Sequence, residues 1–242
     1  MRKRLSGVTR QFYIMPIFST VGVSSRKADI DALRDMKTRL GSGGDGVTIG
    51  FSEVYGYMNE TLGPEHDYNI DPRRLEYILS LSTELRMPVM VHLNGGNWCD
   101  FLGESRLSLH DYLEKDRANV QWYHDNTVDS DDDPCTELGN EVFLTHSLYA
   151  ERVMKYKRRN LVAASRILYA FYLEHPDLLV GVTTDSEVNM NSSEMLYRGK
   201  EKVADYNPLV IREFREEMAR AYGKTSDFST RGMRHRSRDL EN

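Results

Sequence analysis

The sequence predicts an α/β fold, a partial (β/α)₈ TIM barrel of about four strand–helix units. Short runs of β-branched and aromatic residues alternate with stretches whose apolar residues recur at the helical period. This alternation is typical of a parallel sheet covered by helices. Polar residues stand directly after three of the predicted strands, at the carboxyl ends where barrels of this class bind their ligands.

The first predicted unit begins with a strand at residues 12–18, an apolar and aromatic run. Ser24 and Ser25 follow it, and either hydroxyl can cap the next helix. That helix is expected to bury one apolar face, which consists of Ile30, Leu33, Met36 and Leu40. The basic start of the chain faintly resembles a signal peptide, but Pro16 interrupts its apolar part and favours the strand.

Glycine-rich residues 41–46 are expected to form a turn before the second strand at residues 47–51. A phosphate-binding glycine loop follows its strand, whereas these glycines precede theirs, so we interpret them as a turn only. Asp71 and Pro72 mark the start of the next helix, as N-cap and first-turn proline. No dinucleotide fingerprint follows any predicted strand, which favours a barrel over an open doubly wound sheet.

The second half of the chain supplies two further units and a long insertion. The third strand is expected at residues 88–93, and a polar insertion follows over about residues 99–140. A long helical pattern over about residues 142–173 then leads to the fourth strand at 178–183.

The last predicted helix begins at Asn207 and Pro208, its cap and first proline, and Gly223 closes it. We therefore expect one domain over residues 1–223, followed by a polar tail at 224–242. A complete (β/α)₈ barrel needs roughly 250 residues. Because about four units already extend to Gly223, we expect the amino-terminal half of a longer barrel, with open edges that favour self-association.

The 242 residues carry a formal net charge of −5 without a stripe of Lys and Arg, so neither nucleic acid nor an anionic membrane is expected as a partner. No apolar run reaches the roughly 18–20 residues that span a bilayer. Cys99 and Cys135, the two cysteines, lack metal-ligand spacing, and a single disulfide between them is possible only in an oxidising compartment. We expect no cofactor, and a secreted or periplasmic location is favoured.

Residues that can bind or cleave a polar substrate lie at or after the carboxyl ends of the second, third and fourth strands. They are Glu53 and Tyr55, then His92, Asn94, Asn97 and Trp98, then Asp185, Glu187 and Asn189. Because side chains alternate along an extended chain, the last three are expected on one side. A carboxyl beside another carboxylate has a raised pKa and can act as an acid near neutral pH. The alternative to a catalytic role is that Asp185 only orients a neighbouring side chain, or that the carboxyls of Asp185 and Glu187 both bind arginines.

The aromatic and amide side chains of this set favour a carbohydrate ligand. Trp98 and Tyr55, with Tyr57 and Trp122, can offer flat faces to sugar rings, while the asparagines and His92 can bond sugar hydroxyls. The alternatives are ordinary packing for the tyrosines and a hydrogen-bonded core histidine for His92.

An acidic segment of the insertion also invites a metal interpretation. Asp129, Asp131 and Asp133 have the spacing that begins a calcium loop, but Pro134 stands where that loop requires glycine. We therefore expect a solvated loop and no metal site. Cys99 has no nucleophile signature around it, so packing or a disulfide is expected there.

A resemblance to a known family rests on four segments and one motif. They are residues 13–18, 46–57, 92–100 and 181–191, and the motif Asp205-Tyr206-Asn207-Pro208. Together they resemble (β/α)₈ glycoside hydrolases of the large retaining clan, and the β-galactosidase-like members most. The resemblance implies that Glu187, at the end of strand four, is the general acid/base. It also implies a nucleophilic Glu after strand seven, which this chain is expected to lack.

The same resemblance has a departure at Ser186, where the clan carries an Asn that binds the sugar 2-hydroxyl. Retaining cleavage needs two carboxyls roughly 5–5.5 Å apart, so we expect this chain alone to be inactive. Two other functions stay open. One is a non-catalytic carbohydrate-binding or scaffold protein on a barrel-like fold, and the other is an open-sheet α/β enzyme acting on a different small polar substrate.

Overall fold

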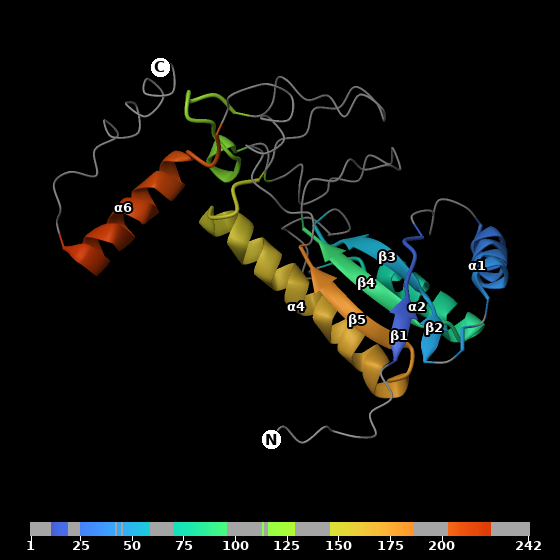
Figure 1. The fold of residues 1–242 in the computed structure, drawn as a ribbon. Helices are drawn as coiled ribbons and strands as arrows, with labels where there is room; N and C mark the ends of the chain where they lie inside the picture. The colour runs from blue at the N-terminus through green and yellow to red at the C-terminus, as the bar shows by residue number, and fades with distance from the viewer. Residues whose placement is uncertain are drawn as a thin grey trace, which may run out of the picture.

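The fold is mixed α/β (Figure 1). The computed structural model describes residues 11–18, 25–41, 43–44, 46–58, 70–95, 113, 116–128, 146–185 and 203–223. In chain order, the elements are β1 (Phe12–Ile14), α1 (Arg26–Leu40), β2 (Val47–Ile49), β3 (Phe51–Gly56), α2 (Arg73–Leu85), β4 (Val89–Asn94), the 3₁₀-helix η1 (Arg117–Asn119), α4 (Glu151–Glu174), β5 (Leu179–Thr184) and α6 (Pro208–Tyr222).

The described strands pair in parallel and in the order of the chain. β1 pairs with β2, and β3, β4 and β5 form a three-stranded sheet in that order. Only Gly50 separates β2 from β3, and a parallel bridge between Ile17 and Ser52 connects the two small sheets. Glycine is required at position 50 because a Cβ there would collide with the Pro88 carbonyl and the Met15 side chain.

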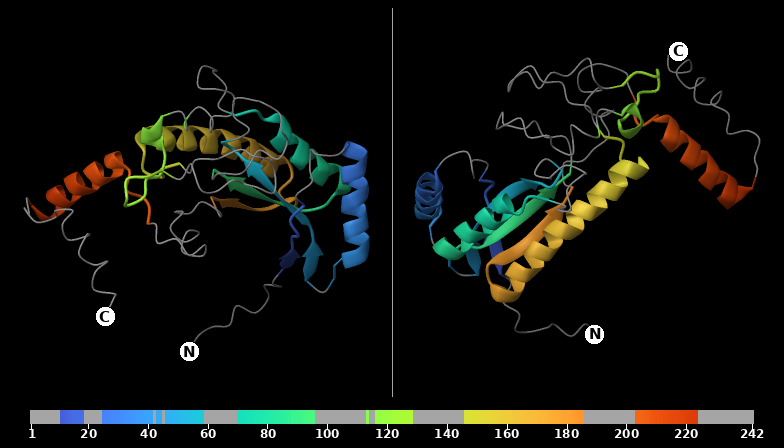
Figure 2. Two further views of the ribbon diagram at one scale, coloured as in Figure 1. Left: turned by 90° about the horizontal axis from the view of Figure 1, so that it is seen from above. Right: turned by 180° about the vertical axis from the view of Figure 1, so that it is seen from behind.

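Helices α2 and α4 lie side by side on one face of the three-stranded sheet (Figure 2). α2 also contacts β3 and α1, and α4 contacts β5. Right-handed crossover connections between neighbouring parallel strands place successive helices on the same face in this way. α6 extends away from the sheet (Figure 1), and none of its residues is buried.

The hydrophobic core lies between the sheet and the helices that cover it. Its members from the strands alternate along the chain, and those from the helices recur every three or four residues. They include Phe51, Val89, Val91 and Leu93 from the strands, Leu75, Ile78 and Leu79 from α2, and Val153, Ala164 and Leu168 from α4. Burying each large apolar side chain stabilises the fold by about 1.5–3 kcal/mol.

Three helix starts follow the predicted capping chemistry. The Ser25 hydroxyl accepts a hydrogen bond from the Ala28 N–H at 3.3 Å and caps α1. Asn207 caps α6 with its side chain, as predicted. The Asp71 carboxylate accepts from the Arg73 N–H at 3.0 Å, although α2 begins one residue later than predicted, with its proline in the N-cap position. Local sequence therefore sets these boundaries.

Other boundaries differ from the prediction. β1 spans Phe12–Ile14 rather than residues 12–18, but main-chain pairing continues beyond it: the Ser52 N–H donates to the Pro16 carbonyl and the Phe18 N–H donates to the Ser52 carbonyl, both at 2.8 Å. The second strand continues past Gly50 to Gly56. α4 begins at Glu151, after Ala150 in an extended conformation, and the Ser147 N–H before it donates to the Asn119 carbonyl at 2.7 Å.

The described part of the insertion consists of position 113 and residues 116–128, with η1 and a short bridge between Trp122 and Val128. The polar tail at 224–242 lies outside the described residues. Among the helices in the described ranges, none combines the length and the apolar character needed to cross a membrane.

Candidate functional site at the strand ends

The carboxyl ends of β3, β4 and β5 meet at one edge of the sheet. The register aligns Gly56 with Asn94. Two main-chain hydrogen bonds continue the pairing at this edge. The Tyr57 N–H donates to the Asn94 carbonyl at 3.0 Å, and the Asp185 N–H donates to the Leu93 carbonyl at 2.8 Å. Segments far apart in the sequence therefore deliver polar residues to one place.

Asp185 follows β5 and is held by groups from three other parts of the chain. Its Oδ1 accepts hydrogen bonds from the Tyr57 hydroxyl at 2.8 Å and the Gly95 N–H at 3.0 Å. Its Oδ2 lies 2.9 Å from Nζ of Lys157 on α4. The φ angle of Asp185 is 49°, in the left-handed region that Asp adopts more readily than most residues. Such a conformation persists where surrounding contacts hold it.

Tyr57 is the buried partner of this carboxylate. Burial raises the pKa of the Tyr57 phenol, and the hydrogen bond to Asp185 raises it further, so the hydroxyl stays a donor. A Cβ at Gly95 would collide with the phenol ring, so glycine is required for this approach. Asn160, which is fully buried on α4, donates to the Tyr57 carbonyl at 2.9 Å. Tyr57, Gly95, Lys157 and Asp185, which we call the Asp185 cluster, thus support the strand ends.

His92 and Asn94 lie on the face of the sheet opposite the helices. Val91 and Leu93 are buried in the core, and alternation along β4 turns the residues between and after them the other way. His92 Nδ1 lies 2.6 Å from the hydroxyl of Thr183, its register partner on β5. His92 Nε2 is buried and has no hydrogen-bond partner within the part of the chain that the structure describes.

Glu53 and Tyr55 do not lie at this edge, in contrast to the prediction. Because β3 continues to Gly56, both are inside the strand and their side chains face the helices. Glu53 is 1% exposed, and its Oε1 lies 3.7 Å from the Arg74 guanidinium of α2. Tyr55 is fully buried, and its hydroxyl donates to the Asp71 carbonyl at 2.9 Å. The packing interpretation therefore describes Tyr55, and the same holds for the fully buried ring of Tyr57.

The remaining predicted site residues lie outside the described residues. They are Glu187, Asn189, Asn97 and Trp98. Cys99, Cys135 and the acidic segment 129–133 also lie outside them. In the ranges that the structure does describe, no group of three or more His, Cys, Asp and Glu side chains is arranged to hold a metal ion.

The sequence interpretation missed Lys157 and Asn160. Both lie on the buried stripe of α4, which also contains Val153, Ala164 and Leu168. A Lys and an Asn three residues apart on an otherwise apolar stripe were the available signal, because buried polar side chains require partners. The partners themselves, Asp185 and the Tyr57 carbonyl, follow β5 and β3 and could not be identified from helical spacing.

A second polar cluster connects the insertion to the start of α6. Asp205 Oδ1 accepts from the Trp122 N–H at 3.2 Å, and its Oδ2 accepts from the Ser147 hydroxyl at 2.6 Å. The Asn207 amide donates to two carbonyls of the segment before Trp122, both at 2.8 Å. The 205–208 motif that contributed to the family resemblance thus has a structural role here.

Comparisons with known proteins show no family. No protein-family model matches the chain, and no curated protein matches it significantly. The geometry at the strand ends is therefore the main basis for a functional proposal.

Proposed function

We propose that the described strands and helices form the amino-terminal half of a (β/α)₈ barrel. Doubly wound sheets reverse their strand order at a switch point, whereas the described strands here follow the chain order throughout. The outer strands are poorly covered: Phe12 and Ile14 on β1 are 61% and 48% exposed, and Val182 on β5 is 41% exposed. Such exposure is expected at the open edges of an incomplete barrel.

We further propose that the chain belongs to a glycoside hydrolase and binds carbohydrate at the carboxyl edge of the sheet. The observation that carries this proposal is that His92 and Asn94 lie near the carboxyl end of β4 on the face opposite the helices, with His92 Nδ1 2.6 Å from the Thr183 hydroxyl on the neighbouring parallel strand. Parallel α/β folds bind their ligands at this edge. His92 Nε2, which lacks a hydrogen-bond partner among the described residues, suits a sugar hydroxyl as its partner.

Glu187 is our candidate for the general acid/base, because it follows Asp185 by two residues at the end of β5. Asp185 itself is a poor second carboxyl, since Lys157, Tyr57 and the Gly95 N–H already bind it. Glu53 is buried against the helices. We therefore propose that the nucleophilic carboxylate of a retaining mechanism belongs to the second half of the barrel.

The engagement of Asp185 also favours a second candidate, a non-catalytic carbohydrate-binding or scaffold protein. Both candidates place a sugar at the same edge, and they differ only in whether Glu187 transfers a proton.

Titration calorimetry of the full chain with a panel of oligosaccharides tests the shared part of the proposal. We expect His92→Ala to weaken binding about tenfold or more, which corresponds to about 1.4 kcal/mol for one lost hydrogen bond. His175→Ala is the matched control, because His175 caps the end of α4 beside the amino end of β5. Equal affinity of wild type and His92→Ala, or no binding of any glycan by wild type, would contradict the proposal.

Glu187→Gln in the completed barrel separates the two candidates. A hydrolase should keep glycan binding and lose turnover of aryl glycosides in this variant. Binding without turnover in the unsubstituted protein supports the scaffold. Unchanged turnover in the variant would remove Glu187 from the mechanism.

A further inference from the structure

Glu53 is a buried acid that the proposed function does not use. It lies in the middle of β3 on the face covered by helices, and only 2% of its side chain is exposed. One carboxylate oxygen lies 3.7 Å from the Arg74 guanidinium, and the other, Oε2, makes no hydrogen bond within the described chain. A buried carboxylate with one long ion pair and an unsatisfied oxygen is costly to keep charged.

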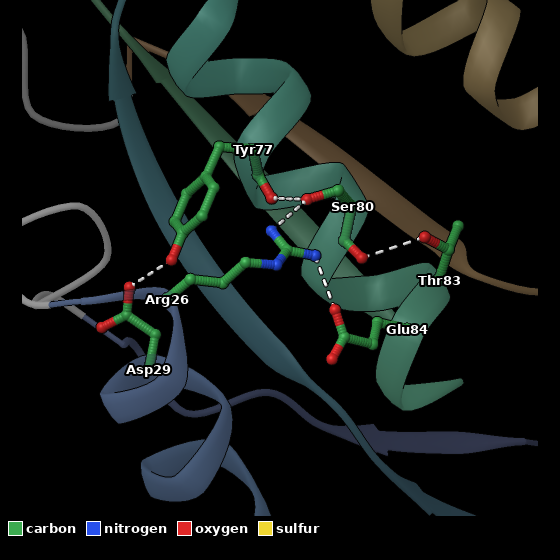
Figure 3. A network of polar contacts seen from close by, with 6 residues as sticks. All are labelled: Arg26, Asp29, Tyr77, Ser80, Thr83 and Glu84. Carbon is green, nitrogen blue, oxygen red and sulfur yellow. Dashed lines mark hydrogen bonds and ion pairs between the residues drawn. The ribbon is translucent and has the colours of Figure 1, made fainter.

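The elements packed around Glu53 supply both signs of charge. α2 contributes Arg74, and α1 contributes the carboxylate of Asp29, which is 1% exposed. The hydroxyl of Tyr77 on α2 donates to Asp29 Oδ2 at 2.6 Å (Figure 3). β4 contributes Val91, the register partner of Glu53, which carries no charge. The Asp29 carboxylate therefore opposes the stabilising effect of Arg74 on a charged Glu53.

The same α1–α2 contact continues outward as a hydrogen-bonded network (Figure 3). Arg26 of α1 donates to the Ser80 hydroxyl at 2.9 Å and pairs with Glu84 at 2.6 Å, both on α2. Because Arg26 and Glu84 are each about two-fifths exposed, water screens this outer pair, whereas it does not reach Glu53. The two acids, Glu84 and Glu53, thus differ in burial and in how closely a cation pairs with them.

We propose that Glu53 holds a proton in the folded chain at neutral pH, and that release of this proton weakens the packing of α1 and α2 on β3. Glu53 is then a pH-sensitive switch inside the fold. Burial is the main cause that raises the pKa of Glu53 from 4.5 to about 8, Arg74 opposes the rise and Asp29 adds to it. Below pH 4.5 the carboxyl is protonated in both the folded and the unfolded chain. Between these two pKa values the unfolded chain releases a proton that the folded chain keeps, so stability falls as pH rises through this window and levels off above it.

Thermal unfolding of the full chain, followed by circular dichroism at a series of pH values, tests the proposal. Glu53→Gln mimics the protonated form, so the Tm of wild type should fall by several degrees relative to this variant between about pH 5 and 8, and the difference should be constant above about pH 9. Glu84→Gln is the matched control, and its Tm difference from wild type should change little with pH. A pH-independent difference between wild type and Glu53→Gln overturns the proposal.

A second measurement needs no variant and decides the case if Glu53→Gln does not fold. Infrared spectroscopy of the wild-type chain in D₂O should show the C=O stretch of a protonated carboxyl at pH 7, and this band should disappear as the pH passes about 8–9. Exposed carboxyls do not contribute at pH 7, because their pKa values lie near 4. Absence of the band from the folded wild-type chain at pH 7 overturns the proposal.

Discussion

The hydroxyl of Tyr57 donates a hydrogen bond of 2.8 Å to Oδ1 of Asp185, a residue 128 positions later in the chain. This bond joins the end of β3 to the end of β5 across β4, and the Gly95 N–H donates to the same oxygen. The strand that supplies Asp185 forms the edge of its sheet. The stability of this edge therefore depends on a few side chains rather than on a second neighbouring strand.

Tyr57→Phe removes this bond and leaves the ring in place. We expect a loss of about 1.5–3 kcal/mol in the free energy of unfolding, since the acceptor is a carboxylate and the donor is fully buried. Urea unfolding followed by circular dichroism measures the loss. Tyr169→Phe on α4, where the ring is 63% exposed, should change stability by less than about 0.5 kcal/mol. Equal effects of the two variants would contradict the role given to Tyr57.

Lys157→Met tests the other oxygen of the same carboxylate. The Lys157 side chain is 10% exposed and that of Asp185 31%, so the pair is partly screened and we expect a loss of about 1 kcal/mol. The double variant with Tyr57→Phe should deviate from additivity by about 0.5 kcal/mol or more, because both residues bind one group. Strict additivity would show that the two contacts act independently.

Gly95→Ala places a methyl group against the Tyr57 phenol. We expect a loss of about 1–3 kcal/mol from the forced shift of a fully buried ring. Gly181→Ala is the control in β5, because a Cβ there meets only the Met90 side chain at an ordinary distance of 3.9 Å. Melting temperatures of the two variants should differ clearly, and a similar shift for both would contradict the packing described for Gly95.

Asn207 has two functions that can be separated by substitution. Asn207→Asp keeps an oxygen that can cap α6 at the Leu209 N–H, but it removes the amide donor to two carbonyls of the insertion. Asn207→Ala removes both. We expect Asn207→Ala to cost about 2–3 kcal/mol, and Asn207→Asp to cost at least as much, because its buried carboxylate would face two carbonyl oxygens; urea unfolding measures both. A clearly smaller loss for Asn207→Asp would mean that the helix cap, and not the amide donor, is the main contribution of Asn207.

The exposed outer strand β1 leads to a prediction about association. Phe12, Ile14 and Ile17 present apolar side chains that are 48–62% exposed, next to an open sheet edge. We expect the isolated chain to form dimers or larger species in sedimentation velocity experiments, and Ile14→Lys with Ile17→Lys to reduce them. A monodisperse, cooperatively melting wild-type monomer would contradict both this prediction and the open-barrel proposal.

Local chemistry explains which parts of the fold were predictable. The capping residues Ser25 and Asn207 act on N–H groups two or three residues away, so their roles are visible in a short window. The third and fourth strands were predicted within one residue of β4 and β5, because each is a short apolar run with clear polar or helical neighbours.

The directions of the β3 side chains could not be predicted in the same way. A strand whose two faces are both buried has no alternation to fix its phase, and β3 is buried over Phe51, Ser52 and Glu53 in succession. The sequence interpretation also ends this strand at residue 51 and so expects Glu53 at the carboxyl edge, whereas β3 continues to Gly56 and Glu53 faces α2. The role of Lys157 could not be predicted either, because its partner Asp185 is brought next to it by tertiary packing, which the spacing of residues along α4 does not reveal.

Because the strands lie in the sheet in the order of the chain, their arrangement also bears on the order in which they pair during folding. A segment that contains α2 separates β3 from β4 in the sequence, whereas His92 on β4 and Thr183 on β5 lie 91 positions apart. Closing a longer loop costs more entropy, and distant pairings form more slowly. During synthesis, which releases the amino-terminal units first, β3, α2 and β4 can assemble before β5 leaves the ribosome. We therefore expect the Asp185 cluster to be among the last parts of the described sheet to form.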